Sequence, residues 1–161
     1  SSLRGESMKV RLGTVEDIDL IVRLNNELNQ MMSKLQPDDF KKISEDIDWV
    51  RQYLLNEKAD YLLLEDEGEI RGLALVEQLE SIDLPSLLKR HYVYLVHLVV
   101  DPLYRGCGYG HELFKAAKDW GKDRQLEYIE LSVLANNQAA LMFYEKEGLM
   151  NVRNVMRTPI K

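Results

Sequence analysis

Residues 99–110 combine residue types and a spacing that could bind an anion. An apolar run ends at Asp101, and three glycines then occupy alternate positions, Gly106, Gly108 and Gly110, before a helical pattern begins. Glycine lets the main chain approach a ligand closely, and the first N–H groups of a helix carry partial positive charge and have no partner within it. The pattern therefore predicts a loop that binds a phosphate or a pyrophosphate.

Two common nucleotide-binding motifs do not fit this loop. A P-loop needs Lys followed by Ser or Thr after its last glycine, but Gly110 is followed by His111 and Glu112. A dinucleotide fingerprint needs a glycine where this chain has His111 or Leu113, depending on which glycine is taken first. Neither motif therefore explains this loop.

The loop resembles the signature of the GNAT superfamily of N-acetyltransferases, which reads Gln or Arg, two residues, Gly, one residue, then Gly or Ala. The segment from Arg105 to Gly110 satisfies every position. Further along, Asn137 to Gly148 matches the family's second cofactor segment, N-x-x-A-x-x-F-Y-E-K-x-G. The specific motifs lie between Leu98 and Gly148, and two separate matches are much stronger evidence than the short loop alone.

The resemblance implies acetyl-CoA as the cosubstrate and assigns roles to individual residues. Main-chain amides of the loop would hold the CoA pyrophosphate, and the preceding strand would bind the pantetheine arm and polarise the acetyl carbonyl. Asn137 would contact the pantetheine or thioester side, and Tyr144 would face the sulfur. The implied cofactor-binding residues are Leu98, Val99, Val100, Arg105, Gly106, Cys107, Gly108, Tyr109, Gly110 and Asn137.

Two side chains are candidates for moving protons. Thioester aminolysis needs a neutral amine, although a lysine-like amine has a pKa of ~10.4, and it needs a hydrogen-bond or proton donor for the departing thiolate. We expect Tyr144 to be that donor. His97, a lone polar residue in an apolar strand, is the candidate base. The family often has an acidic residue in this neighbourhood, so Glu130, Glu77 or a chain of waters remain alternatives.

The amino-acid composition disfavours several classes of binding partner. A net charge of -6 and a pI of about 5.1 disfavour nucleic acid and anionic membranes, and no apolar run approaches the ~20 residues of a membrane-spanning helix. One cysteine, Cys107, cannot form an internal disulfide, and we expect it to act only as a loop residue. His91 and His111 lack metal-ligand spacing, so we expect no metal. A cytoplasmic location is the default expectation, and a homodimer is compatible with the resemblance.

Hydrophobic periodicity predicts an α+β domain, a mixed and mainly antiparallel sheet flanked by helices, over Met8 to Lys161. Ser1–Ser7 look like an added remnant or a disordered end. The expected strands are at 8–12, 61–64, 70–76, 92–100, 126–133 and 150–156. The expected helices are at 18–35, after a Thr14–Asp17 capping box, from Ser44 to Leu54, at 113–120, closed by Gly121, and at 137–147, ended by Gly148. A connection at 81–90 could hold a short helical turn.

These observations predict an N-acetyltransferase that transfers an acetyl group from acetyl-CoA to a primary amine of a small molecule or peptide. A noncatalytic acyl-CoA-binding sensor with the same fold is the alternative, because it would keep the loop and transfer nothing. A nucleotide-binding regulatory module is a third reading, which tighter binding of ATP than of CoA would favour. No motif in the sequence identifies the acceptor amine.

Overall fold

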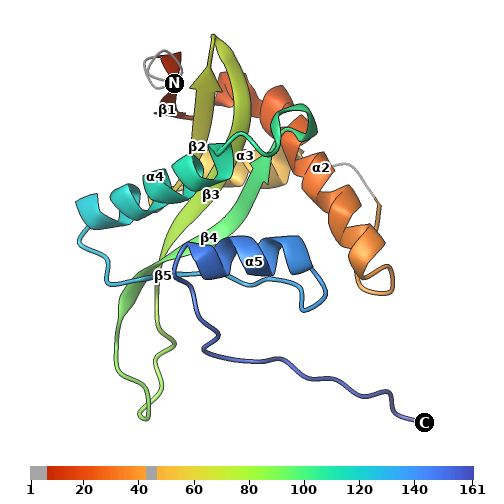
Figure 1. Ribbon diagram of the computed structural model, residues 1–161. Helices are drawn as coiled ribbons and strands as arrows, with labels where there is room; N and C mark the ends of the chain where they lie inside the picture. The colour runs from red at the N-terminus through yellow and green to blue at the C-terminus, as the bar shows by residue number, and fades with distance from the viewer. Residues whose placement is uncertain (1–6, 43–46) are drawn as a thin grey trace.

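The structure, a computed structural model, describes residues 7–42 and 47–161 (Figure 1). Five strands form one sheet in the order β1-β2-β3-β4-β5, in which the first four are antiparallel and β5 is parallel to β4. This confirms the predicted α+β class. The strands are β1 Lys9–Leu12, β2 Ala59–Asp66, β3 Glu69–Glu80, β4 His91–Val100 and β5 Ile129–Glu130; the helices are α2 Ile18–Leu35, α3 Ile47–Leu54, α4 Tyr109–Asp123 and α5 Gln138–Lys146; 3-10 turns cover Val15–Asp17 and Pro102–Tyr104.

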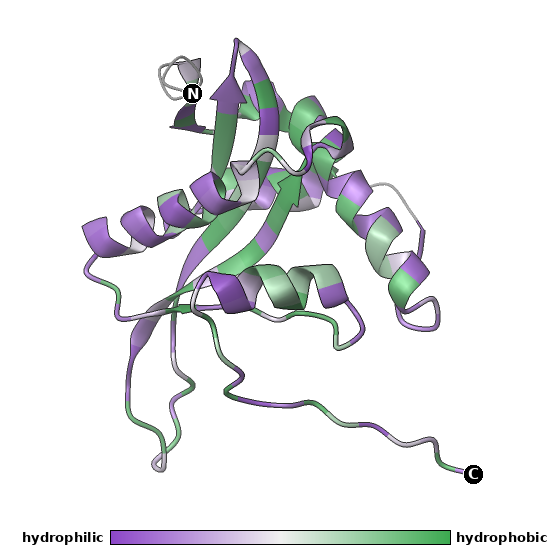
Figure 2. Ribbon diagram, viewed as in Figure 1, coloured by the Kyte–Doolittle hydropathy of each residue, from purple (hydrophilic) through white to green (hydrophobic). Residues whose placement is uncertain are grey.

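Helices cover both faces of the sheet, whose strands are largely apolar (Figure 2). Successive strand side chains point to opposite faces, so both faces of these strands can be buried. On β2, Leu62 and Leu64 pack toward α4, whereas Tyr61 and Leu63 pack toward α2 and α3. The α4 side is completed by Leu113, Phe114, Ala117 and Trp120, and the other side by Ile21, Leu24 and Val50. Burial on both faces explains why β4 reads as a nearly continuous apolar run.

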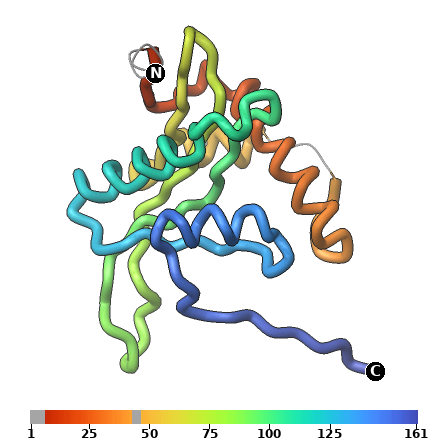
Figure 3. Tube along the Cα trace, viewed as in Figure 1, coloured from red at the N-terminus to blue at the C-terminus, as the bar shows by residue number. Residues whose placement is uncertain are grey.

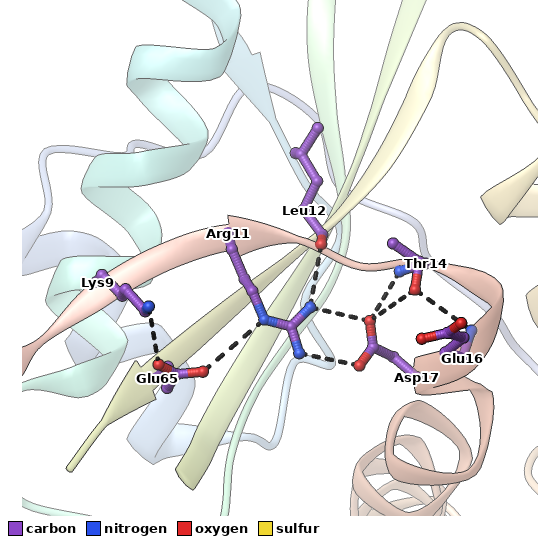
Figure 4. Close-up of polar contacts among 7 residues, drawn as sticks. All are labelled: Lys9, Arg11, Leu12, Thr14, Glu16, Asp17 and Glu65. Atoms are coloured by element: carbon purple, nitrogen blue, oxygen red, sulfur yellow. Dashed lines mark hydrogen bonds and ion pairs between the residues drawn. The ribbon is translucent and has the colours of Figure 1, made fainter. Parts of the chain in front are cut away.

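The predicted capping box joins β1 to α2 (Figure 4). Thr14 accepts a hydrogen bond from the Glu16 amide, and the Asp17 carboxylate accepts one from the Thr14 amide at 2.8 Å. The cap opens a 3-10 turn that leads directly into α2. Arg11 makes a two-pronged contact with Asp17, both N–O distances being 2.9 Å, and this bond lowers the pKa of Asp17. The strand end and helix start are thereby fixed together.

Several other segments have the predicted type of structure but differ from the prediction in length. The β2–β3 turn uses Glu67 and Gly68, both at positive φ. The strand expected at 126–133 pairs with β4 only at residues 129–130. Ser44, where a helix was expected to begin, lies outside the described residues, and of the apolar side chains of α3 Val50 is fully buried. Residues 81–90 contain turns but no helix.

Among the described residues, no helix combines the length and apolar character needed to cross a membrane.

The prediction that Gly121 closes its helix is wrong. α4 continues to Asp123, and the turn of the chain falls at Gln125, which has φ of 59°. Gly121 is buried inside the helix, where a Cβ would lie 2.4 Å from Val93 Cγ2. The glycine is therefore required by the close approach of α4 to β4 rather than by a helix end.

We expect Gly121→Ala to lower the free energy of unfolding by about 1 kcal/mol, and by no more than about 2 kcal/mol. Alanine gains ~1 kcal/mol of helix propensity, but overpacking against the buried Val93 costs ~1–3 kcal/mol. Urea denaturation followed by circular dichroism measures the difference. Adding Val93→Ala removes the clash, so the substitution at Gly121 should cost less in that background than in the wild type. An equal cost in both backgrounds would contradict the proposed contact.

The strand expected at 150–156 is also wrong. These residues lie outside the sheet (Figure 1). Their apolar side chains are exposed. The sequence does alternate between apolar and polar residues over part of this segment. A strand also needs a neighbour to accept its main-chain hydrogen bonds, and within the described residues this segment has none.

Candidate active site

A β-bulge in β4 sets the geometry of the site. Leu75 pairs with His97 and Val76 pairs with Leu95, so Val96 is an extra residue on β4. As a result, Val96 and His97 both lie on the α2 and α3 side, while Leu98 packs toward α4. The bulge thus changes which face each later side chain of β4 meets.

Beyond the bulge, β4 loses its neighbour on one side. β5 pairs with β4 only at Val93 and Tyr94, so the two strands separate before Leu98. In the described part of the chain, the β5-facing main-chain groups from Leu98 to Val100 have no main-chain partner. They are free to bind an extended ligand, as the resemblance implied for the pantetheine arm.

The glycine-rich loop follows directly from this free edge. Gly106 and Gly108 have φ of 77° and 83°, and Gly108 is the N-cap of α4. Within the described residues, no amide of Arg105, Gly106, Cys107 or Gly108 donates a hydrogen bond to the protein, and the same holds for Gly110 and His111. A cradle of unpaired amides at a helix start fits a pyrophosphate. Cys107 is exposed, and its Sγ lies 3.8 Å from the Arg105 carbonyl oxygen.

We expect Gly106→Val to weaken acetyl-CoA binding about tenfold. A β-branched residue at positive φ is strained by roughly 1–2 kcal/mol, so the loop must shift, and about 1.4 kcal/mol corresponds to a factor of ten in affinity. Gly68→Val is a matched control, because Gly68 has φ of 79° and, like Gly106, open space around its Cβ position. Isothermal titration should show weaker binding for the first variant alone. Equal affinities would remove Gly106 from the cofactor site.

The two motifs meet in space. A Cβ on Gly110 would lie 3.3 Å from the ring of Phe143, so the start of α4 rests against α5. Asn137, which was expected to contact the cofactor, also has a structural role in this protein. Its side-chain oxygen caps α5 by accepting a hydrogen bond from the Ala140 amide at 3.1 Å. Its Nδ2 group lies 3.6 Å from Met31 Sδ. Asn137 therefore positions α5, whatever contact it makes with a ligand.

Tyr144 lies among aromatic side chains between α4 and α5. Its ring centroid is 5.2 Å from that of Phe143 and 6.3 Å from that of Phe114. Burial raises the pKa of the Tyr144 phenol to about 12. In the described part of the chain its hydroxyl has no hydrogen-bond partner. A protonated, unpaired hydroxyl is available as a donor to a ligand.

His97 lies on the opposite face, against α2 and α3. Its Nδ1 is 3.1 Å from Asn25 Oδ1, and its ring is 5.3 Å from that of Trp49. Because an amide oxygen can only accept, Nδ1 carries the proton and Nε2 keeps its lone pair. Burial lowers the pKa of His97 to about 4, so the imidazole is neutral near pH 7.

The alternative bases lie near the same strands. Glu77 is paired across the β3–β4 ladder with Tyr94, and burial raises the pKa of its carboxyl. The pKa of Tyr53, on α3, is raised by burial and by the nearby charge of Glu77. Glu130 is the β5 partner of Tyr94. Glu77 therefore combines a raised proton affinity with a position on the same side of the sheet as His97.

Sequence reasoning missed Asn25 and Trp49 as neighbours of His97. Asn25 is fully buried, and its Nδ2 finds no partner within the described residues. A polar residue in the buried stripe of a helix was the available signal, because such residues are retained only where something pairs with them. Nothing in the spacing showed that this partner would be 72 residues away.

Comparison with known proteins agrees with this geometry. The acetyltransferase (GNAT) family matches residues 22–149. A candidate [ribosomal protein bS18]-alanine N-acetyltransferase of Bacillus subtilis (strain 168) is 24% identical over 140 residues, which is 87% of this chain and 79% of that protein.

Solved structures show the same fold. A tetramutant of the BH1408 protein from Bacillus halodurans superposes with a TM-score of 0.90 at 28% identity, covering 94% of this chain and 99% of that one. The aminoglycoside N-acetyltransferase AAC(6')-Iy, solved with CoA, has a TM-score of 0.68 at 14% identity, with 96% and 95% of the two chains covered. At this identity the second likeness concerns the fold alone.

Together, the sheet with its separated strands and the glycine-rich helix start define an acyltransferase. The chain belongs to the acetyltransferase (GNAT) family, as the match over most of its length shows.

Proposed function

We propose that the protein transfers an acetyl group from acetyl-CoA to a primary amine of a small molecule or peptide. The observation that carries this proposal is the continuous path from the unpaired amides at 105–108 to the free edge of β4 at Leu98. A pyrophosphate at the loop would direct an extended arm along that edge toward the bulge. The candidate donor Tyr144 and the candidate base His97 come from the helices and strand around this path.

The free edge of β4 would bind the substrate through its main chain. N–H groups in this edge donate to the pantetheine amides, and one directed at the thioester carbonyl stabilises the negative charge that develops on its oxygen. The amine then forms a bond to the carbonyl carbon, the C–S bond breaks, and the sulfur leaves as a thiolate. Main-chain donors are held by the β3–β4 ladder, so they need no reorganisation as the charge develops.

Tyr144 would assist the departing sulfur by hydrogen bonding. A thiol has a pKa of ~8.5, well below the value of about 12 for this phenol. Complete transfer of the phenolic proton to the thiolate is therefore uphill, whereas donation of a hydrogen bond is favourable. We assign Tyr144 the role of a hydrogen-bond donor that stabilises the thiolate.

The side chains that would accept the amine proton, His97 and Glu77, lie on the α2 and α3 side of the sheet. The Nε2 lone pair of His97 is free to accept a hydrogen bond, but a pKa of about 4 makes the ring a weak base for an ammonium group. Glu77, whose pKa is raised by burial, is the better final acceptor. A relay through water from the amine by way of His97 fits both observations.

An assay of CoA release from acetyl-CoA across a panel of amines tests the proposal. Polyamines, aminoglycosides, and peptides with a free α-amino group or lysine side chain sample the acceptor classes, and mass spectrometry locates each added acetyl group. The proteins described above support this choice, since their names state alanine and aminoglycoside acceptors. Tight acetyl-CoA binding without acetylated product from any amine would instead support the noncatalytic sensor.

A further inference from the structure

Asn25 is a polar side chain on the apolar face of α2. It is fully buried, like Ile21 and Leu24 beside it. Asparagine is a weaker helix former than leucine, and an amide removed from water costs free energy unless it forms hydrogen bonds. Packing alone therefore does not account for an asparagine at this position.

The side chain of Asn25 pairs with His97 of β4, 72 residues further along the chain. Asn25 Oδ1 lies 3.1 Å from His97 Nδ1. α2 packs against β4, although the two elements are well separated in the sequence (Figure 3). At the other end of the amide, Asn25 Nδ2 is buried and has no hydrogen-bond partner among the described residues. The amide thus satisfies the histidine while one of its own donors stays unpaired.

The His97 ring lies in a largely apolar environment. Trp49 of α3 packs against it, with ring centroids 5.3 Å apart and an interplanar angle of 33°. The pKa of His97 is lowered by burial. In the described part of the chain, the Asn25 amide is the polar group that contacts the ring. The ionisable side chains that interact with one another on the same side of the sheet are Tyr53 of α3, Glu77 of β3 and Tyr94 of β4.

The contact with Asn25 decides which ring nitrogen carries the proton. A neutral imidazole has one donor and one acceptor nitrogen, and the partner of one nitrogen determines the state of the other. Because Asn25 Oδ1 accepts, the proton lies on Nδ1 and Nε2 has a lone pair. No described residue donates a hydrogen bond to Nε2, so this lone pair is available to a substrate or a water.

We propose that Asn25 is a positioning residue, which holds His97 as the Nδ1–H tautomer and so keeps Nε2 ready to accept the proton that leaves the acceptor amine. This assignment rests on the proposed acetyl transfer. The ammonium formed with the new C–N bond gives its proton to Nε2 through water, while the Nδ1–H group of the imidazolium stays on Asn25 Oδ1. Nε2 then releases the proton through water to Glu77, which restores the neutral tautomer.

Nuclear magnetic resonance of the full chain containing ¹⁵N-labelled histidine tests the tautomer without any substrate. We expect His97 to show a protonated Nδ1 and an unprotonated Nε2 near pH 7, and the His97→Gln variant assigns its signals. In Asn25→Leu, which keeps a side chain of similar size without the amide, the proton should be shared between the two nitrogens. Ser33→Ala, at another buried polar position of α2, is the matched control and should leave the His97 signals unchanged.

Rates of acetyl transfer over a range of pH test the catalytic consequence, with an amine that the panel identifies. Asn25→Leu should lower kcat by about tenfold or more, a part of the ~10²–10⁴-fold that a positioned base contributes. Its acetyl-CoA affinity should be unchanged by isothermal titration. Asn25→Asp should raise the pKa of His97 by about 1–3 pH units, because a carboxylate stabilises the imidazolium. The acidic limb of the kcat profile should then move to higher pH, which a purely structural role of Asn25 would not produce.

The proposal fails if His97 of the wild type is protonated at Nε2, because the Asn25 amide then presents its NH₂ group to the ring. It also fails if the Nδ1–H tautomer persists in Asn25→Leu, or if kcat of that variant equals the wild-type value. A panel in which no amine is acetylated contradicts the proposed function and the catalytic role of the pair, whereas the spectra still decide whether Asn25 orients the ring. Circular dichroism checks that each variant is folded, and the wild-type spectrum needs no substitution.

Discussion

Replacing Tyr144 by Phe should lower kcat for acetyl transfer by about 10²–10³-fold, the cost of removing one hydrogen-bond donor to a group that becomes charged. Acetyl-CoA affinity should change little, because the ring keeps its contacts with Phe114 and Phe143. Folding should also be unaffected, since the hydroxyl has no partner among the described residues. Steady-state assay of CoA release and isothermal titration measure these two quantities separately.

Tyr128→Phe is the matched control for this substitution. Tyr128 stacks on Tyr92 with ring centroids 4.9 Å apart, at the beginning of β5 rather than between α4 and α5. Removing the Tyr128 hydroxyl should leave kcat unchanged. If Tyr144→Phe also left kcat unchanged, the sulfur would have to leave without help from this side chain. A rise in KM with unaltered kcat would assign Tyr144 to binding alone.

The free energy of unfolding should decrease by about 3 kcal/mol between pH 7 and pH 4 because of His97 alone. The unfolded chain gains a proton on this imidazole near pH 6.5, whereas the folded chain gains it only near pH 4, so protons favour unfolding throughout that window. One pKa unit corresponds to about 1.36 kcal/mol. Well above pH 6.5 the contribution is complete, and it stops changing only well below pH 4, because the folded imidazole is half protonated at pH 4.

Urea denaturation at a series of pH values measures this dependence. His97→Gln should flatten the curve between pH 6.5 and pH 4, because the amide does not titrate. Leu55→Gln, at an exposed position with no titrating side chain, should keep the wild-type slope. Carboxylates whose pKa is lowered, such as Asp17, add a loss of stability at more acidic pH, and this part should persist in both variants. An unchanged slope in His97→Gln would show that the ring is hydrated in the folded protein.

The parts of the fold and site that depend on local sequence could be predicted. Gly106 and Gly108 adopt positive φ before a helix, and Gly148 follows the end of α5 at φ of 96°, because short-range backbone geometry selects glycine there. The strand character of β2 and β4 follows equally from their apolar runs, which suit strands covered on both faces. The predicted roles of Tyr144 and His97 remain predictions, although the structure describes the surroundings of both.

The parts that depend on distant contacts could not be predicted. In the sequence, a glycine that ends a helix cannot be distinguished from one that leaves room for a neighbouring side chain. Only the packing of α4 on β4 shows that Gly121 makes room for Val93. Residues 150–156 look like a strand because periodicity reports the side chains and not the presence of a neighbour. The extra residue Val96 has no signature either, since one apolar residue within an apolar run changes no pattern.

The bulge at Val96 makes this place in β4 unusually tolerant of a change in chain length. Leu95 and Leu98 both pack toward α4, and His97 lies between them on the other side, so removing Val96 would restore a regular two-residue period and leave each of these side chains on its present face. Removing a residue from a regular part of β4 would instead turn one part of the strand over relative to the other. A single-codon deletion at the bulge should therefore be less damaging than a deletion elsewhere in this strand.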